Sequence, residues 1–399
     1  MNVLQQKAAL ALMIRLDERP DIIHCHDGHT ALLPAMLREI EGYRHYFSRT
    51  GCVVTIHNAG TGYHQEVADL PFAKAVTGLP QRVIDNNLLA GAFDPLLTAA
   101  AYALLNTVSE NYARELQETD DDSLTGWLGH TLVKRGFSLA GVTNGIDPAD
   151  YNLKNYQALG LAAGFIPGST SARNKAGKAA CRRDLIMSLA AGRMTGLKQT
   201  GHLDWLPQLP LFTFVGRFTA QKGIDKLQAA LKKLLLIQAN FQILILGSGQ
   251  KDEEDKLRLL ARQPANSGRI CLLCGFDSIT ATRMFAAGDF FLIPSRYEPC
   301  GLTDFQAQLF GNLPIVHAVG GLVKVRDGKT GFTYDAHDSG VLIAAMQRAI
   351  NLFATEKPAL ARMQKAAVIL IHRKYTWDKV MSRYLELYRR SNGLARNGQ

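Results

Sequence analysis

Residues 289–303 read DFFLIPSRYEPCGLT, and this stretch decides the fold that the sequence predicts. Its first part is an apolar run that ends at Pro294, which is typical of a strand buried in a parallel sheet. Helical spacing begins at Leu302, directly after a turn that contains Gly301. A strand that leads through a short turn into a helix is the building unit of an α/β protein.

The turn between this strand and this helix has the chemistry of a ligand site. Free backbone N–H groups and the positive end of the dipole at a helix start suit an anion, above all a phosphate. Glu298 offers carboxylate oxygens that accept hydrogen bonds from the hydroxyls of a sugar. Taken alone, the segment also fits an ordinary turn with nothing bound.

A second segment, LFTFVGRFTAQKG at residues 211–223, has the same organisation with two cations. It begins as a buried strand, and a helix is expected from about Ile224. Arg217 and Lys222 therefore follow the carboxyl end of a strand, where open α/β sheets bind ligands. Arginine holds a phosphate through two parallel hydrogen bonds and lysine supplies a compact charge, so the pair suits a diphosphate. A solvated surface loop is the alternative for such a pair.

Seven segments, in order along nearly the whole chain, resemble the bacterial glycogen synthase and starch synthase family. Besides VGR…QKG and PSRYEPCGLT within the two stretches above, they are DIIHCHDGH at 21–29, VVTIHN at 53–58, TVS at 107–109, GVTNGID at 141–147 and GGL at 320–322. The resemblance implies an α/β protein of two Rossmann-like domains that face each other across a cleft, the first of them incomplete at its N-terminus.

The resemblance also implies the reaction. Glucose would pass from ADP-glucose or UDP-glucose to the non-reducing end of an α-1,4-glucan in glycogen biosynthesis, with retained configuration and without a metal or another cofactor. Arg217 and Lys222 would neutralise the leaving diphosphate, Glu298 would hold sugar hydroxyls, and His57 would flank the reacting carbon. The substrate-binding residues implied in this way are Asp27, His29, Asn58, Asn144, Gly216, Cys300, Gly301, Leu302, Gly320 and Gly321.

Three positions depart from the family pattern. Gly28 stands where the family usually has tryptophan, which puts the local packing and the acceptor contact in question. Val319 replaces a usual threonine and removes one hydroxyl. Asp304 replaces a common glutamine and adds a charge near the expected nucleotide pocket, so the choice of nucleotide stays open.

The start of the chain is a further expectation. The family normally has roughly a hundred residues before this point, a large part of a typical domain, including a Lys-x-Gly-Gly-Leu loop that this sequence lacks. The chain opens instead on an amphipathic stretch from Leu4 to Leu16. We expect this chain to bind ADP or ADP-glucose, to synthesise little or no glucan, and to associate or precipitate.

Length and composition bound the remaining possibilities. A chain of 399 residues is longer than one typical hydrophobic core requires, so we expect two domains, at residues 1–205 and 206–399. We expect the linker between them at residues 195–210. We also expect a final helix, Tyr375–Arg390, that packs back on the first domain. No apolar run is long enough to span a membrane and no signal-peptide pattern is present, so we expect a cytoplasmic protein. The formal charge of +10 suits an anionic ligand, and no basic stretch with interleaved aromatics indicates nucleic acid.

Several alternatives remain beside this interpretation. His24, His26 and His29 could bind a metal, which we do not favour. Gly247-Ser248-Gly249 lacks the third glycine of a dinucleotide site, and Asn144 before Gly145 could serve only the turn. As a whole, the protein could be a non-catalytic glucan- or nucleotide-binding remnant, or a retaining glycosyltransferase with another acceptor.

Overall fold

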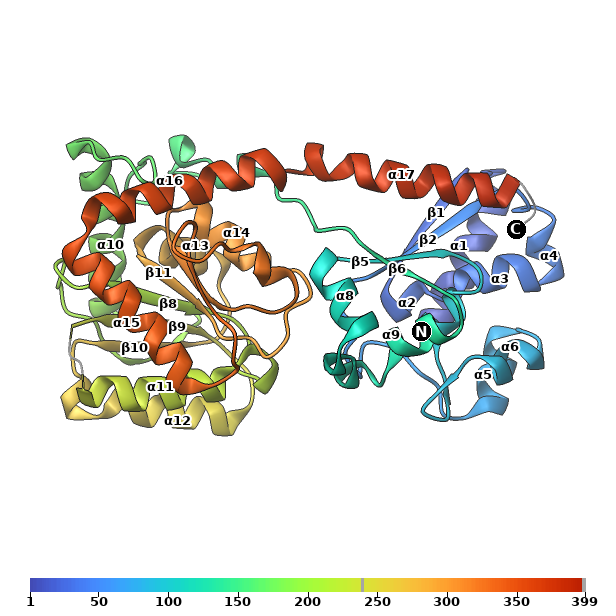
Figure 1. Ribbon diagram of the computed structural model, residues 1–399, viewed down its shortest axis with the longest axis horizontal. Helices are drawn as coiled ribbons and strands as arrows, with labels where there is room; N and C mark the ends of the chain where they lie inside the picture. The colour runs from blue at the N-terminus through green and yellow to red at the C-terminus, as the bar shows by residue number, and fades with distance from the viewer. Residues whose placement is uncertain (238–239, 397–399) are drawn as a thin grey trace. The chain divides into compact units, whose positions relative to one another are not determined.

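The computed structural model describes residues 1–237 and 240–396, which form two compact units (Figure 1). Unit 1 comprises Met1–Gly145 with Asp378–Gln399, and unit 2 comprises Ile146–Trp377. Each unit is built around its own sheet with helices on its faces, so the α/β class predicted from the sequence is confirmed.

The sheet of unit 1 is entirely parallel. Its strands, in spatial order, are β1 (Ile22–His26), β2 (Gly51–Ile56), β5 (Leu104–Thr107) and β6 (Leu139–Gly141). All residues of β2 are buried, as its run of β-branched residues predicts. A small hairpin, β3 (Leu88–Leu89) with β4 (Ala92–Phe93), lies within the excursion at residues 60–100.

Helices cover both faces of this sheet. One face packs on α17 (Trp377–Arg396), where Val53 and Val142 meet Tyr384 and Leu387. The other face packs on the main core of unit 1. The remaining helices of the unit are α1 (Asn2–Arg15), α2 (Asp27–Thr30), α3 (Leu33–Glu39), α4 (Glu41–Arg44), α5 (Leu70–Thr77), α6 (Gln81–Asn86), α7 (Pro95–Ala99), α8 (Glu110–Glu118) and α9 (Leu128–Lys134).

The sheet of unit 2 contains both strands that the sequence analysis predicts, at the start of residues 211–223 and of residues 289–303. In spatial order its strands are β13 (Phe332–Tyr334), β12 (Leu313–His317), β11 (Phe290–Ile293), β8 (Leu211–Val215), β9 (Gln242–Gly247), β10 (Ile270–Cys274) and β7 (Lys198–Gly201). All pairings are parallel except that of β7 with β10. From β8 the chain runs to β9 and β10 on one side, and it returns through β11 to the other side. The point between β8 and β11 is therefore a topological switch point, where open α/β sheets place their ligands.

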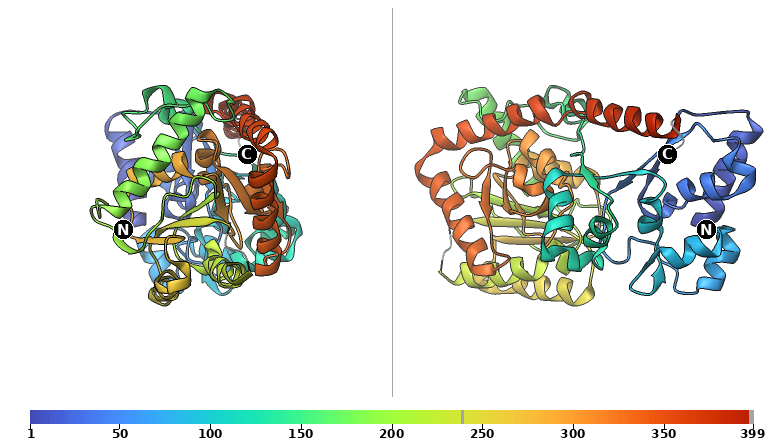
Figure 2. Two further views of the ribbon diagram at one scale, coloured as in Figure 1. Left: turned by 90° about the vertical axis from the view of Figure 1, so that its left-hand side faces the viewer. Right: turned by 45° about the vertical axis from the view of Figure 1, so that its right-hand side comes forward.

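Alternate residues of these strands pack on two separate layers of helices (Figure 1, Figure 2). The first layer is α11 (Ile224–Ile237), α12 (Lys251–Arg262), α15 (Ser339–Thr355) and α16 (Lys357–Lys374). The second is α10 (Ala172–Ala190), α13 (Ser278–Ala287) and α14 (Thr303–Leu309). Both faces are buried, which is why the central strands read as continuous apolar runs rather than alternating ones.

The division into units differs from the expected boundary at residue 205. Residues 146–205 group with unit 2, because α10 packs on α13 and because β7, inside the segment interpreted as a linker, adds an edge strand to the sheet. The linker interpretation of residues 198–201 is thus wrong. Residues 378–399 group with unit 1, and α17 continues to Arg396, beyond the expected Arg390.

A buried ion pair anchors α10 in unit 2. Arg182 Nη1 lies 3.2 Å from Asp289 Oδ2, and its other terminal nitrogen donates to the carbonyls of Leu206 and Leu209 and to Gln242 Oε1. Asp289 Oδ2 also accepts from the N–H of Leu211, at the start of β8. One guanidinium therefore connects α10, the segment before β8 and the strand pair β8–β11.

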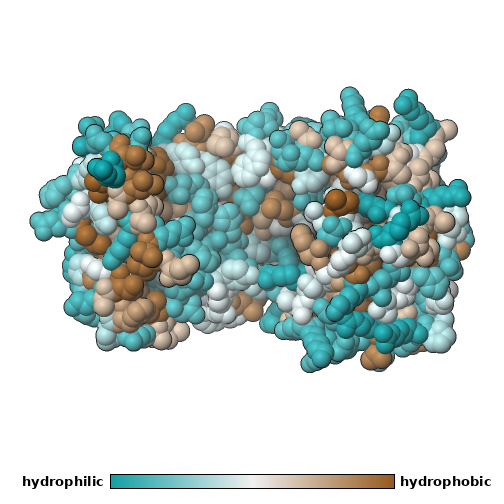
Figure 3. Space-filling model, turned by 180° about the vertical axis from the view of Figure 1, so that it is seen from behind, coloured by the Kyte–Doolittle hydropathy of each residue, from teal (hydrophilic) through white to brown (hydrophobic). Residues whose placement is uncertain are grey.

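The surface of unit 1 carries apolar side chains over α1. Leu4, Leu12 and Leu16 are each more than half exposed, while Gln6 on the opposite side is buried. Figure 3 shows hydrophobic residues gathered on this side of unit 1. The helix predicted at Leu4–Leu16 is present, but apolar residues line both of its faces. Within residues 1–237 and 240–396, no helix is both long and apolar enough to cross a membrane.

We predict that Arg182→Met lowers the free energy of unfolding by about 3–5 kcal/mol, because it leaves the Asp289 carboxylate buried without its cation. Arg183→Met is the matched control, since the adjacent arginine is exposed. Chemical denaturation of both variants measures the difference. Equal stability of the two would contradict a structural role for the pair.

Candidate active site

The predicted residues of unit 2 gather at the carboxyl ends of β8, β11 and β12. Gly216 and Arg217 follow β8, residues 294–302 follow β11, and Gly320 and Gly321 follow β12. Neighbouring parallel strands bring these loops to one edge of the sheet, beside the switch point. Segments far apart in the sequence, such as those of Lys222 and Glu298, which are 76 positions apart, thus form one half-site.

Lys222 and Glu298 meet directly in this half-site. Lys222 Nζ donates a hydrogen bond of 2.6 Å to Glu298 Oε2, and Ser295 Oγ donates to the same oxygen at 2.9 Å. The Lys222 side chain is 24% exposed and that of Glu298 10%. The ammonium therefore keeps access to solvent while the carboxylate is held in one orientation.

The glycines of both turns permit a close backbone contact. A Cβ on Gly320, whose φ is +50°, would lie 2.0 Å from the carbonyl oxygen of Glu298, and a Cβ on Gly321 would lie 2.1 Å from that of Cys300. The N–H of Gly321 donates to the Glu298 carbonyl at 2.9 Å. This N–H is thus occupied within the protein, and the two turns form one rigid unit, which we call the cradle (residues 298–301 and 320–321).

Arg217, Gly216 and Leu302 lie at the margin of this half-site. Arg217 is exposed and donates to Gln221 at 3.2 Å, and Leu302 is 44% exposed. The carbonyl oxygen of Gly216 lies where a Cβ on Gly247 would be, at 1.9 Å. Gly247 is therefore required for the close approach of two loops, which explains it without a dinucleotide.

In unit 1, Asp27 and His57 are brought together at the ends of β1 and β2. The N–H of His57 donates to Asp27 Oδ1 at 2.7 Å, and Asp27 adopts a left-handed backbone with φ +55°. His57 Nε2 lies 3.0 Å from Nδ1 of His26, so the two rings form a hydrogen bond whose direction depends on their tautomers. Burial, and then the charge of His57, lower the pKa of His26.

His24 serves the packing of unit 1. Its ring nitrogens lie 2.7 Å from Thr55 Oγ1 and 2.8 Å from the hydroxyl of Tyr388, so it connects β1, β2 and α17. Burial, with the charges of His26 and His57, lowers its pKa to about 4. In the part of the chain that the structure describes, no three His, Cys, Asp or Glu side chains converge as metal ligands.

The other predicted residues of unit 1 are more scattered. The side-chain oxygen of Asn58 accepts from the N–H of Gly60 at 2.9 Å, which closes a turn. His29 is exposed, and its carbonyl accepts from Gln6 at 3.0 Å. Asn144 is half-buried in the segment after β6.

Steric crowding explains why the residue at position 28 is a glycine. A Cβ there would lie 2.0 Å from the carbonyl oxygen of His64. The His64 ring is buried and lies 2.6 Å from Asp94 Oδ2 and 2.8 Å from the carbonyl oxygen of Ala59. Both ring nitrogens face acceptors, so both donate when the ring is protonated. This pair holds the 59–66 segment against Gly28, in the space beside the predicted residues of unit 1.

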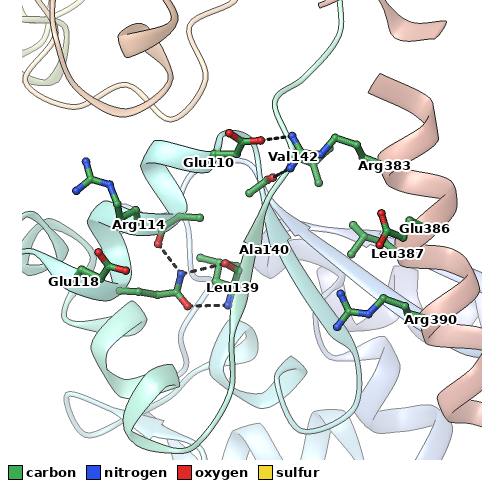
Figure 4. Close-up of a pocket in the computed structure, with 13 residues that line it drawn as sticks. Glu110, Arg114, Glu118, Leu139, Ala140, Val142, Arg383, Glu386, Leu387 and Arg390 are labelled. Carbon is green, nitrogen blue, oxygen red and sulfur yellow. Dashed lines mark hydrogen bonds and ion pairs between the residues drawn. The ribbon is translucent and has the colours of Figure 1, made fainter. Parts of the chain in front are cut away.

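A hollow of about 480 Å³ in unit 1 contains none of the predicted site residues (Figure 4). It borders the outer edge of β6. The Gln117 amide bonds to both the N–H and the carbonyl of Leu139, as a neighbouring strand would, and Arg383 donates to the carbonyl of Gly141 and pairs with Glu110. These side chains satisfy an exposed sheet edge, which is a structural role.

Sequence reasoning missed four side chains that shape the two half-sites. They are Ser295 and Lys324 in unit 2 and His64 and Asp94 in unit 1. Ser295 was within the quoted stretch but lacked an assigned role. The other three lie in segments without a local motif, so their contacts follow only from the fold.

Comparison with known proteins identifies the family of the chain. Residues 2–130 match the model of the starch synthase catalytic domain, and residues 203–368 match that of glycosyl transferases group 1. The glycogen synthase of Geotalea daltonii is 34% identical over 397 residues, which span 96% of this chain and 74% of that protein. The chain belongs to the glycogen synthase family. The glycogen synthase of Lacticaseibacillus casei is 31% identical and covers 98% of this chain and 76% of its own length.

Solved structures lead to the same family. The catalytic domain of starch synthase IV from Arabidopsis thaliana, bound to ADP and acarbose, superposes with a TM-score of 0.81 at 25% identity, over 98% of this chain and 77% of that one. Sucrose-phosphate synthase from Thermosynechococcus elongatus gives a TM-score of 0.56 at 20% identity over 96% of this chain and 76% of that one, a likeness of fold alone. The chain is thus a glucosyltransferase of glycogen biosynthesis, as its motifs implied.

The His64–Asp94 pair predicts a pH dependence of stability in unit 1. Burial opposes the charge on His64, but the hydrogen bond and charge of Asp94 outweigh it and raise the pKa of His64 above its usual value. The protonated ring therefore contributes stability that is complete below pH 6.5, the ordinary pKa, and is lost as the pH rises through the raised, folded-state pKa. We predict that the free energy of unfolding falls across this window in the wild type and less in His64→Gln.

The same substitution lowers stability by about 3 kcal/mol at pH 6, since Asp94 is left buried without its partner. His45→Gln, at an exposed position of the same unit, is the control. Urea denaturation from pH 5.5 to pH 9 measures both effects. Parallel curves for wild type and His64→Gln would show that the pair carries no charge.

Proposed function

We propose that this protein transfers glucose from ADP-glucose to the non-reducing end of an α-1,4-glucan with retention of configuration, and that it does so in the cytoplasm. The observation that carries the proposal is the Lys222–Glu298 pair at the switch point of unit 2. It offers a cation and a fixed carboxylate where α/β sheets bind ligands. The similar starch synthase IV, whose structure contains ADP and acarbose, favours ADP over UDP as the nucleotide.

In this proposal unit 2 binds the donor. Lys222, with its partly exposed ammonium, and the exposed Arg217 neutralise the diphosphate as it leaves. The free oxygen of Glu298 accepts from hydroxyls of the glucosyl group. Gly216, Cys300, Gly301, Leu302, Gly320 and Gly321 form the surrounding surface of the donor site.

Unit 1 contributes the groups around the reacting carbon in the same proposal. Asp27 fixes the backbone of His57, so the imidazole and carbonyl of His57 flank the glucosyl group, where positive charge develops. His29, Asn58 and Asn144 contact sugar hydroxyls. The bond from the glucosyl carbon to the diphosphate breaks, the bond to the acceptor oxygen forms, and the acceptor proton leaves with the diphosphate.

The direct test is incorporation of radiolabelled glucose into glycogen from ADP-glucose and, separately, from UDP-glucose. The proposal requires incorporation from ADP-glucose at the higher kcat/KM, whereas the expectation from the start of the sequence is nucleotide binding with little or no glucan synthesis, so this assay decides between them. Preference for UDP-glucose would contradict the proposal that ADP-glucose is the donor. Incorporation into another acceptor but not into glucan would contradict the proposal that an α-1,4-glucan is the acceptor. Nucleotide binding without transfer to any acceptor would identify a non-catalytic remnant.

We predict that Lys222→Ala and Arg217→Ala each lower kcat/KM for ADP-glucose by about 100-fold or more, since removal of one preplaced charge costs about 3 kcal/mol of transition-state stabilisation. Lys232→Ala, at an exposed position of α11, is the control. Thermal unfolding of the same preparations separates catalysis from folding. Near-normal turnover in both variants would remove these residues from the site.

For Glu298→Gln we expect a larger loss in turnover than in stability, because the shape is kept and the charge that pairs with Lys222 is removed. Gln306→Glu, which makes the reverse change on the helix after the cradle, tests whether any change of charge nearby has the same effect. Steady-state kinetics and denaturation on one preparation decide the matter. Small and equal effects on both would assign Glu298 to the turn alone.

A further inference from the structure

Lys324 lies against the cradle, and neither the motifs nor the proposed mechanism uses it. Its ammonium donates to the carbonyl of Cys300, to that of Gly301 at 2.7 Å and to that of Gly321 at 3.0 Å. The side chain is only 6% exposed. The ammonium therefore contacts both of the turns that form the cradle.

The same ammonium faces a buried carboxylate. Lys324 Nζ lies 3.1 Å from Asp304 Oδ1, and the Asp304 side chain is fully buried. Gln308 Nε2 donates to the other oxygen, Oδ2, at 3.2 Å. Burial raises the pKa of Asp304 to about 6, against the lowering effect of Lys324, and the charge of Glu298 adds to the rise.

A second ion pair, Lys324–Asp304, therefore lies beside the cradle in addition to Lys222–Glu298. The negative charge of Glu298 acts on Asp304, and each of the two carboxylates forms an ion pair with one lysine. Without Lys324, the negative charge of Asp304 in the first turn of α14 would have no cation beside it. It would lie close to residues 298–301, which border the donor site in our proposal. A negative charge there opposes the binding of an anion.

We propose that Lys324 is a positioning residue of the donor site, which allows the cradle to accept a diphosphate by cancelling the charge of Asp304. The inference rests on the proposed function. It makes Lys324 and Asp304 a matched pair, so that a glutamine-to-aspartate change at position 304 is tolerated only with a cation at position 324. Lys222 then remains the cation that faces the ligand.

The test is a double-mutant cycle of Lys324→Met, Asp304→Asn and the combination of both, with ADP binding followed by calorimetry. We expect Lys324→Met to weaken ADP binding about tenfold, the effect of one unit charge at roughly 10 Å in a medium of effective dielectric constant about 20. The double variant should return to within about threefold of wild type, and Asp304→Asn alone should bind ADP at least as tightly as wild type. Lys329→Met, exposed and five residues further along, is the matched control.

A pH series distinguishes charge compensation from loss of packing. In Lys324→Met the carboxyl of Asp304 takes up a proton more readily, so the affinity ratio of variant to wild type should approach one between pH 8 and pH 6. A ratio that does not change with pH, or a double variant as weak as Lys324→Met, would overturn the inference. If Lys324→Met does not fold, a tenfold loss of ADP affinity in Asp304→Asn would also overturn it.

Binding of inorganic pyrophosphate by the same variants separates this inference from the proposed function. Wild-type protein that binds pyrophosphate but neither ADP nor UDP would contradict the proposed function and leave the cycle measurable. The cycle would then decide the role of Lys324 with pyrophosphate alone. Equal pyrophosphate affinity in wild type and Lys324→Met would reject the role of Lys324.

Discussion

The backbone contact between residues 298–301 and residues 320–321 is the constraint on which the half-site of unit 2 depends. It exists because Gly320 and Gly321 have no Cβ, so the carbonyls of Glu298 and Cys300 approach at distances that no other residue allows. The contact joins the ends of β11 and β12 at the switch point of the sheet. Every charged group of the half-site takes its position from this contact or from the loop after β8.

Burial of charge in the cradle is possible because each carboxylate has its own ammonium. Glu298 pairs with Lys222 and also accepts from the Ser295 hydroxyl, whereas Asp304 Oδ1 is buried and faces the ammonium of Lys324, which also donates to the carbonyl of Gly301. Removal of one member of a buried pair costs far more than the net contribution of the pair to stability. Such pairs therefore hold a fixed geometry, and a site that must neutralise a leaving group needs its charges fixed before the reaction begins.

The sequence predicted β8 and β11 of unit 2 because they are buried on both faces and read as continuous apolar runs. It did not predict β7, since KQTG has no apolar pattern and becomes a strand only by pairing with β10. Likewise, α10 joined unit 2 through Arg182 and Asp289, a contact over 107 residues that no local pattern reveals. Local periodicity reports burial of a segment, whereas the partner of that segment is a property of the whole fold.

By itself, the sequence determined the α/β class and the family, and it indicated the loops in which we propose the functional residues, because motifs such as RYEPCGLT combine a turn after a strand with charged and polar groups within a few positions. Only the tertiary structure showed that Lys222 contacts Glu298, that Gly28 faces the carbonyl of His64, and that Lys324 lies against Asp304. The physical reason is that hydrogen bonds and ion pairs act over about 3 Å. Residues 20 to 80 positions apart reach that distance only through the packing of a complete sheet and its helices.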